Sequence, residues 1–283
     1  MDKPADWTSH DVIAKLRGIL KEKRIGHGGT LDPMATGVLP VFVGRATRAV
    51  PFCESFDKEY IAGLRLGLIT DTQDTTGRVL AETAVTVTPS DVEHAVQNFI
   101  GEQTQIPPMY SAVKIGGTRL YKLARKGVEV ERKPRSITIH AMELLNQSGN
   151  DWLFRLVCSK GTYVRTICHD IGHRLGCGGT MCSLQRTRAG IFNLDEAVSL
   201  SEVEASVRSG QMEDVMKPVD SLFYGFPSIR IDDKQKSMCL NGNAFALQTD
   251  NGLYRAYDQD DRFLMLGRVE NNTMHTVKSF FDV

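Results

Sequence analysis

The chain has 283 residues, which is long enough for one substantial hydrophobic core and a smaller second unit. Its 34 basic and 34 acidic residues balance, so composition excludes a uniformly basic nucleic-acid-binding surface, and any such surface must be local. The six cysteines are scattered, and we find neither a secretory leader nor an apolar run of about 18 residues, which predicts a cytoplasmic protein with reduced thiols.

The first predicted element is an amphipathic helix over residues 8–20, ahead of a basic tract and a glycine-rich loop. It begins with a Thr-Ser cap, and its apolar residues share one face: Val12, Ile13, Leu16, Ile19 and Leu20. Farther along, residues 57–70 and 77–87 have alternating or β-branched patterns on either side of the polar turn 71–77. This arrangement predicts paired strands.

Two further helices and another strand follow, and the chain then changes to short strands separated by polar turns. Ser90 followed by Glu93 predicts a capping box at the start of the second helix. Residues 152–158 predict a strand, and residues 162–175 predict a third helix. After about residue 220 the chain has short strands and one helical candidate near 232–240, which predicts a small, mostly β unit.

Positive charge is concentrated in residues 114–135, where eight basic and two acidic side chains give a local net charge of +6. The basic residues are Lys114, Arg119, Lys122, Arg125, Lys126, Arg132, Lys133 and Arg135. Tyr110 and Tyr121 accompany them, and a basic arm with interleaved aromatics suits a phosphate backbone with exposed bases. The alternative is an ordinary solvated helix face.

Asp32 is an isolated carboxylate in the stretch GHGGTLDPMATGVLP, since no other residue from 25 to 44 has a full charge at neutral pH. Pro33 favours an extended conformation at Asp32, and Gly28 and Gly29 let the loop approach another molecule closely. The alternative is an Asp that only caps a turn. A buried, unpaired carboxylate costs several kcal/mol, so a functional Asp32 predicts an arginine partner distant in sequence.

Other motifs give little support for a metal or a cofactor. The stretch GHGGTL lacks the last glycine of a dinucleotide fingerprint, and no phosphate-binding GK[ST] occurs. The turn 71–77 lacks the acidic spacing of a calcium loop. Cys177 and Cys182, near His169 and His173, do not have zinc spacing. We therefore expect neither a metal nor a cofactor.

Four stretches together resemble the TruB family of tRNA pseudouridine synthases: GHGGTLDPMATGVLPVFVGRATR, DKEYIAGLRLG, IPPMYSAVKIGGTRLYKLARKG and CSKGTYVRTICHDIGHRLGCGG. They keep the family's order and cover about residues 3–190. The resemblance implies an α+β fold, with a mixed, mainly antiparallel sheet in a catalytic domain over 1–220. It also implies a thumb-like insertion at about 108–136 that clamps the T loop, and a small, mostly β PUA-like barrel over 221–283.

The implied activity is isomerisation of uridine 55 in the T loop of tRNA to pseudouridine, without a cofactor. The nucleotide must first be flipped out of the folded loop. By position in the motifs, Asp32 matches the nucleophile, which attacks either C6 of the uracil or C1′ of the ribose. Tyr60 matches the tyrosine that stacks on the base and takes the C5 proton, and Arg165 matches the arginine that pairs with the aspartate.

The resemblance also implies substrate-binding residues. Asp74 matches a carboxylate that bonds around the base and the arginine, and Tyr163 and Lys3 match residues that line the pocket. His27 matches the histidine that occupies the space vacated by the flipped base. The implied cations of the insertion are Lys114, Arg119, Lys122 and Arg125.

The match weakens in three places. Family members have a strand before DKP and a glycine at the position of Asp6, so we expect the chain to begin inside a longer one. Gln185 stands where an arginine is common, which would weaken one phosphate contact. From Ser221 onward the net charge is −1, which gives poor support for strong backbone binding by the C-terminal unit.

Three other functions remain open from the sequence. One is a guide-RNA-dependent synthase of the dyskerin type, which relies on partner proteins and generally lacks the basic arm. Another is an RNA-binding or tRNA-folding protein in which catalysis is dispensable. An aspartyl-phosphate enzyme would need magnesium ligands and a phosphate cradle that we cannot find. The family interpretation predicts a monomer that binds the T loop and T stem of tRNA, with no obligatory protein partner and no membrane.

Overall fold

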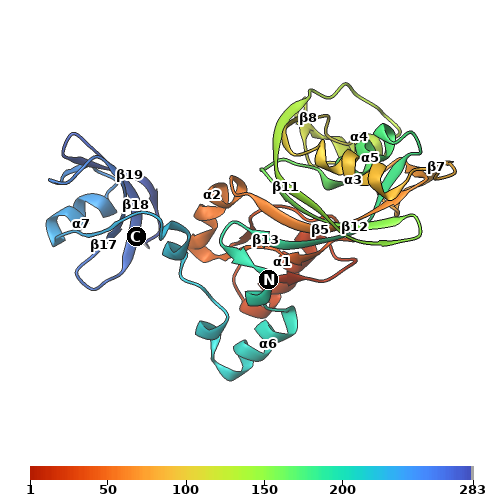
Figure 1. The fold of residues 1–283 in the computed structure, drawn as a ribbon. Coiled ribbons are helices and arrows are strands. Elements are labelled where there is room, and N and C mark those ends of the chain that lie inside the picture. The colour runs from red at the N-terminus through yellow and green to blue at the C-terminus, as the bar shows by residue number, and fades with distance from the viewer. Residues whose placement is uncertain (282–283) are drawn as a thin grey trace.

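A mixed sheet of eight strands organises the main body of the protein, in a computed structural model that describes residues 1–281 (Figure 1). The strand order is β1-β3-β13-β5-β12-β11-β8, with β14 paired to β13. Every pairing is antiparallel except that of β13 with β3. The strands are β1 (Asp2–Lys3), β3 (Thr36–Val38), β5 (Lys58–Leu66), β8 (Gly101–Gln105), β11 (Arg135–Ser148), β12 (Asp151–Cys158), β13 (Gly179–Ala189) and β14 (Phe192–Asn193).

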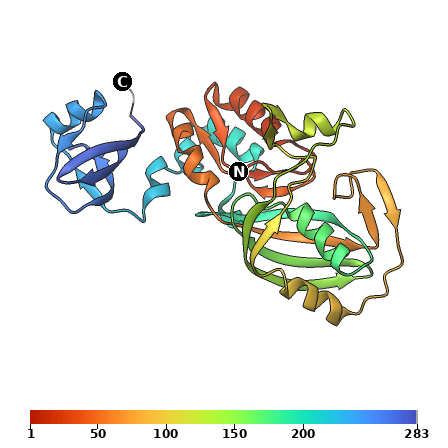
Figure 2. The same cartoon turned by 90° about the horizontal axis from the view of Figure 1, so that it is seen from above.

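Helices cover the sheet at several places. Residues 1–281 contain α1 (Ser9–Leu20), α2 (Val50–Glu54), α3 (Pro89–Gln97), α4 (Leu120–Ala124), α5 (Val164–Arg174), α6 (Leu200–Ser209) and α7 (Asp233–Leu240), of which α7 belongs to the C-terminal part. Helix α5 packs on β13 and β5, α3 packs on β11, and the two helices contact each other (Figures 1 and 2). The α+β prediction and the helices predicted over 8–20 and 162–175 are therefore confirmed to within two residues at each end.

The main core lies between the sheet and these two helices. Strand β12 alternates, so that Trp152, Phe154 and Leu156 point inward, as the period of two in a strand requires. They belong to the same buried cluster as Val96 of α3 and Ile171 of α5. Each fully buried aliphatic or aromatic side chain contributes about 1.5–3 kcal/mol, so this layer holds the helix starts firmly against the sheet.

The cap of α3 differs from the prediction. Thr88, not Ser90, is the N-cap, because its hydroxyl accepts the Asp91 backbone N–H and the Asp91 carboxylate accepts the Thr88 N–H. Pro89 occupies the first turn, where its fixed φ suits the helix and its missing N–H is not needed. The predicted box of Ser90 and Glu93 was therefore wrong by two residues.

Three small two-stranded sheets accompany the main sheet, and the second and third are hairpins. They are β2 (Ile25–His27) with β4 (Val41–Val43), β6 (Leu68–Thr70) with β7 (Val79–Glu82), and β9 (Lys114–Ile115) with β10 (Thr118–Arg119). The β6–β7 pair confirms strands on either side of the turn 71–77, although β5, which precedes β6, pairs with β12 and β13 instead. Gly116 and Gly117 turn the third hairpin with φ of +57° and +80°, values that favour glycine.

The C-terminal part forms a second sheet, set to one side of the main body (Figures 1 and 2). Its order is β15-β17-β18-β19-β16, and α7 contacts β16. The strands are β15 (Ser228–Arg230), β16 (Phe245–Ala246), β17 (Gly252–Tyr257), β18 (Phe263–Glu270) and β19 (Thr273–Ser279). Phe223 packs on Phe52, and Arg48 donates to Ser279, so the two parts touch. The predicted C-terminal unit ends at 283, and residues 282–283 lie outside the described residues.

None of the six cysteines forms a disulfide, and all except the half-buried Cys182 are buried. Burial raises the pKa of Cys53 to about 11 and that of Cys158 to about 12. Within residues 1–281 no helix has the length and apolar character needed to span a membrane.

Candidate active site around Asp32

Asp32 lies in the loop between β2 and β3 and forms an ion pair with Arg165. Arg165 Nε lies 2.9 Å from Asp32 Oδ2, and Arg165 Nη2 donates to Oδ1 at 3.1 Å. The Asp32 side chain is 33% exposed and that of Arg165 only 6%. This two-point pair has the geometry in which a guanidinium binds a carboxylate most strongly. The structure thus contains an arginine partner 133 residues away in sequence, as the isolated carboxylate required.

Arg165 also contacts two other segments. Its Nη1 donates to the carbonyl oxygen of Thr72 at 3.1 Å and lies 3.4 Å from Asp74 Oδ2. Its Nη2 donates to the carbonyl oxygen of Tyr110 at 2.9 Å. One guanidinium therefore joins the Asp32 loop, the turn 71–77 and Tyr110, which precedes the basic segment 114–135.

The electrostatic environment of Asp32 combines opposing effects. Burial raises the pKa of Asp32, the Arg165 guanidinium lowers it, and the nearby Asp74 carboxylate raises it. The net direction is upward from the ordinary value. A partly desolvated carboxylate beside a specific cation is typical of a reactive group.

Asp74 is fixed by its own turn. Its Oδ1 accepts hydrogen bonds from the Thr72 hydroxyl at 2.8 Å, the Thr76 backbone N–H at 3.0 Å and the Thr76 hydroxyl at 2.5 Å. Its Oδ2 is thereby directed to Arg165. The side chain is almost fully buried, so it orients the guanidinium from the side opposite Asp32.

Tyr60 is the third residue of β5, with 8% of its surface exposed. Burial raises its pKa, and the neighbouring Arg186 guanidinium opposes that shift. The phenol is therefore protonated at neutral pH. Any transfer of a proton to its oxygen requires assistance from a neighbouring group.

Arg186 was missed by the sequence analysis. It is among the largest fully buried side chains, and its Nε and Nη2 donate to the carbonyl oxygens of Val38 at 2.7 Å and Gly29 at 3.0 Å. Gly29 precedes Asp32 and Val38 follows it, so Arg186 joins the two ends of the loop that contains Asp32. The available signal was an arginine at the inward phase of a buried strand, which demands partners.

His27 ends β2 and lies half-buried against His10, with ring centroids 5.5 Å apart in an edge-to-face arrangement. Its Nδ1 is buried without a hydrogen-bond partner. Burial lowers its pKa to about 4, aided by His10 and Arg186, so the ring is neutral at physiological pH.

Lys3 is fully buried, and the structure places its ammonium in a cage of main-chain oxygens. Nζ donates to Pro4 at 2.7 Å, Trp7 at 2.6 Å and Pro33 at 3.1 Å. Burial lowers its pKa to about 8. All three donors are used, so the observed arrangement holds the residue after Asp32 and presents no surface for a pocket lining.

Tyr163 precedes α5 and is held through its backbone. Its N–H donates to Gln105 Oε1 at 2.8 Å, and Gln105 Nε2 donates back to its carbonyl oxygen at 3.1 Å. The ring is half-buried, next to the helix start that contains Arg165. Gln105 was not singled out from the sequence, because a polar residue at a strand end gives no distinctive signal.

The four predicted cations of the basic segment are exposed. Lys114, Arg119, Lys122 and Arg125 lie on the β9–β10 hairpin and α4, and Arg125 lies 5.5 Å from the Tyr121 ring. The buried Leu120 anchors the segment. Tyr110, which precedes the segment, contacts Arg165, so the segment adjoins the Asp32 cluster, by which we mean Asp32, Asp74 and Arg165.

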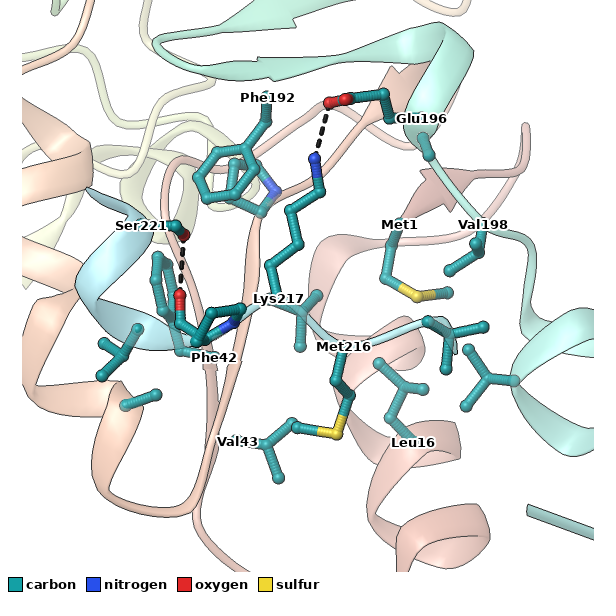
Figure 3. A pocket seen from close by; sticks show the side chains of 18 of the residues that line it. Met1, Leu16, Phe42, Val43, Phe192, Glu196, Val198, Met216, Lys217 and Ser221 are labelled. Atoms are coloured by element: carbon teal, nitrogen blue, oxygen red, sulfur yellow. Dashed lines mark hydrogen bonds and ion pairs between the residues drawn. The ribbon is translucent and has the colours of Figure 1, made fainter. Parts of the chain in front are cut away.

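A separate apolar pocket of about 150 Å³ lies between α1, β4 and residues 212–222 (Figure 3). Leu16, Phe42 and Met216 line it, and the Lys217–Glu196 ion pair of 2.7 Å borders it. None of its lining residues belongs to the Asp32 cluster. No group of three His, Cys, Asp or Glu side chains that could hold a metal occurs within residues 1–281.

Comparison with known proteins identifies the family. Residues 17–164 match the model of the TruB family pseudouridylate synthase N-terminal domain, and residues 165–224 match that of the tRNA pseudouridylate synthase B C-terminal domain. The tRNA pseudouridine synthase B of Clostridium kluyveri is 40% identical over 289 residues, which cover 99% of this chain and 98% of the relative. That of Aromatoleum aromaticum is 44% identical over 273 residues, covering 96% and 88%.

A solved structure supports the same assignment at the level of the fold. A chain of a crystallised Cbf5-Nop10-Gar1 complex superposes with a TM-score of 0.75 at 27% identity, covering 99% of this chain and 83% of that one. The mixed α+β architecture around Asp32 is therefore shared with it. Together with the full-length relatives, these findings establish that the chain belongs to the TruB family of pseudouridylate synthases.

Proposed function

We propose that the protein isomerises uridine 55 in the T loop of tRNA to pseudouridine, with Asp32 as the nucleophile. The observation that supports this most directly is the two-point Asp32–Arg165 pair, in which a partly exposed carboxylate is held by a nearly buried guanidinium. Membership of the TruB family and relatives named tRNA pseudouridine synthase B over nearly their full length agree with it.

The chemistry needs only groups that this chain supplies. The bond between N1 and C1′ breaks, the uracil turns, and a bond forms between C5 and C1′. The C5 proton leaves and N1 gains a proton, so atoms and electrons balance without a cofactor. Asp32, in the ionised form, bonds temporarily to C1′ of the ribose or to C6 of the uracil, and this bond breaks again before the product leaves, which regenerates the carboxylate. Arg165 orients the carboxylate, and Tyr60 stacks on the uracil. Tyr60 receives the C5 proton while a neighbouring proton acceptor takes the proton of its hydroxyl.

RNA binding is assigned to the region next to this cluster. Residues 108–136 act as a thumb-like insertion, and Lys114, Arg119, Lys122 and Arg125 contact the phosphates of the T loop and T stem. The neutral ring of His27 fills the space left by the flipped base, whose unstacking costs a few kcal/mol. Asp74 and Tyr163 border the base, and Lys3 supports the loop.

The remaining assignments follow from the same hypothesis. Residues 1–220 form the catalytic domain, and 221–283 form a PUA-like barrel that adds shape complementarity, since its net charge of −1 gives weak attraction for phosphates. The protein acts in the cytoplasm, where its tRNA substrate is used. We propose a monomer without an obligatory protein partner.

A guide-RNA-dependent activity is the second candidate, because a chain of the Cbf5-Nop10-Gar1 complex has a similar fold. The 40% identity to a relative named tRNA pseudouridine synthase B, over 98% of that relative, favours the tRNA activity. The basic insertion favours it as well, because it supplies RNA contacts without a partner.

The test is tritium release from an unmodified tRNA transcript labelled at uracil C5, followed by mapping of the modified position. We expect release at uridine 55 by the purified protein alone and none by Asp32→Asn. Release only after addition of a guide RNA and partner proteins would support the second candidate. Release that survives in Asp32→Asn would show that another group is the nucleophile.

A further inference from the structure

Gln73 has an unusual backbone conformation inside the turn 71–77. Its φ is +63°, in the left-handed region that non-glycine residues rarely adopt. The residues on either side of it, Thr72 and Asp74, both contact the Arg165 guanidinium. Backbone strain persists where surrounding contacts over-determine it, and it is concentrated at functional sites.

The side chain of Gln73 is tied to the helix that contains Arg165. The Thr166 hydroxyl donates to Gln73 Oε1 at 2.8 Å, and Thr166 is the residue directly after Arg165 in α5. The Gln73 carbonyl oxygen also accepts the Met181 N–H at 3.0 Å. Gln73 therefore connects the turn to both the start of α5 and β13.

These contacts form a closed path around the guanidinium. Arg165 binds the turn through Thr72 and Asp74, and the turn binds the next residue of the same helix through Gln73. Loss of the Gln73–Thr166 bond would remove one of the side-chain contacts that hold the turn against α5, so the turn and the guanidinium bonded to it could shift. A shift of about 1 Å in such a contact can reduce a rate about 100-fold.

We propose that Gln73 and Thr166 form a positioning pair, which sets the orientation of Arg165 and through it the attack geometry of Asp32. The proposal rests on the proposed function, because it concerns the same carboxylate. The pair does not touch the reacting atoms. Its role is to hold the turn 71–77 in a fixed position relative to the start of α5 while the uracil is detached, turned and reattached.

The first test compares Thr166→Val with Thr166→Ser in the tritium-release assay. Valine removes the hydroxyl at similar volume, and serine retains it. We expect kcat to fall about 10- to 100-fold in Thr166→Val, with KM for tRNA within about twofold, and to recover in Thr166→Ser. Thr187→Val is the matched control, because its hydroxyl donates to Glu59 at 2.9 Å on the same sheet and has no link to Arg165.

The second test separates positioning from simple stabilisation. Gln73→Gly relieves the left-handed backbone but removes the side-chain acceptor. The free energy of unfolding should stay the same or rise, while kcat falls as in Thr166→Val. The double variant should be no slower than either single variant, because both changes remove one interaction.

Three results would overturn the proposal. They are an unchanged kcat in Gln73→Gly, a loss that Thr166→Ser does not restore, and additive losses in the double variant. If the wild-type protein releases tritium and the variants have the same kcat, the positioning pair is rejected and the proposed function stands. A wild-type protein that releases no tritium would overturn the pair together with the proposed function.

Discussion

The Asp32 cluster and the basic segment lie next to each other but are built in opposite ways. The cluster joins segments far apart in sequence through a nearly buried arginine that bonds Asp32, Thr72 and Tyr110. The basic segment turns on two adjacent glycines and exposes its cations. Bond chemistry requires atoms held within fractions of an ångström, whereas phosphate binding tolerates movement. Reaction rate and RNA affinity should therefore respond to different residues.

The largest expected effect is that of Arg165→Lys, which should lower kcat about 100- to 1,000-fold. Lysine retains the charge but cannot bond both carboxylate oxygens and the two carbonyls at once. Stopped assays at saturating tRNA would measure this, and filter binding should show an affinity within a few-fold of wild type. The matched control is Arg155→Lys, whose pair with Glu59 is partly exposed at 2.7 Å. Equal losses in both variants would contradict the comparison.

The next effect concerns RNA affinity. Replacing Lys114, Arg119, Lys122 and Arg125 together by Gln should raise Kd about 10- to 100-fold near 0.15 M salt. It should also reduce the slope of log K against log salt by about 3, since each phosphate contact contributes about 0.7–0.9. The value of kcat at saturating tRNA should not change. Substituting the exposed Arg208 and Lys234 is the control and should leave the slope unaltered. A fall in kcat would show that the segment also shapes the catalytic cluster.

The pH profile gives a smaller, directional test. Because burial raises the pKa of Asp32, its carboxylate is ionised above the raised value and protonated below it. The profile of kcat/KM, which reports the free enzyme, should therefore have an acid limb centred above about 3.9, the ordinary Asp value, and fall about tenfold for each pH unit below it. Asp74→Asn should move the limb to lower pH, because Asp74 raises the pKa of Asp32 while Arg165 and Lys3 lower it. A limb that moves upward would disprove this role of Asp74.

The smallest effect is expected from Gly116→Ala. Alanine resists the left-handed φ of +57° by about 1 kcal/mol, so tRNA affinity should fall by about fivefold or less. The melting temperature should stay constant, because an added Cβ meets nothing within 4 Å and the hairpin contributes nothing to the core. Gly18→Ala in α1 is the control and should raise stability by up to about 1 kcal/mol without changing affinity. Unchanged affinity in Gly116→Ala would show that the turn conformation is irrelevant to binding.

Local sequence patterns predicted the helices and strands and the need for an arginine partner of Asp32, the family resemblance named that partner as Arg165, and neither predicted Arg186 or Gln105. Helix periodicity placed the starts of α1 and α5 within two residues. The isolated charge of Asp32 required a distant arginine, and Arg165 is bonded to it. The cap of α3 was misplaced because Thr88 and Ser90 both begin acceptable capping patterns, and only Pro89 favours the first.

The contacts of Arg186 and Gln105 were not predicted, because neither residue lies in a motif and their partners are far apart in the chain. Arg186 bonds Gly29 across 157 positions, and Gln105 bonds Tyr163 across 58. No periodicity encodes such pairs, and their residue types are common on surfaces. Lys3 shows the opposite problem. Its motif suggests a residue that lines the substrate pocket, whereas its buried ammonium donates to three main-chain carbonyl oxygens.

The shielded thiols make the protein suitable for site-specific labelling. Five of the six cysteines are buried, and Cys182 is half-buried. Burial raises the pKa values of Cys53 and Cys239 to about 11, so little thiolate is available to a maleimide at neutral pH. A fluorophore attached through Thr118→Cys at the tip of the basic segment would therefore report on that segment almost alone. Its motion during tRNA capture can be followed in solution without first removing the native cysteines.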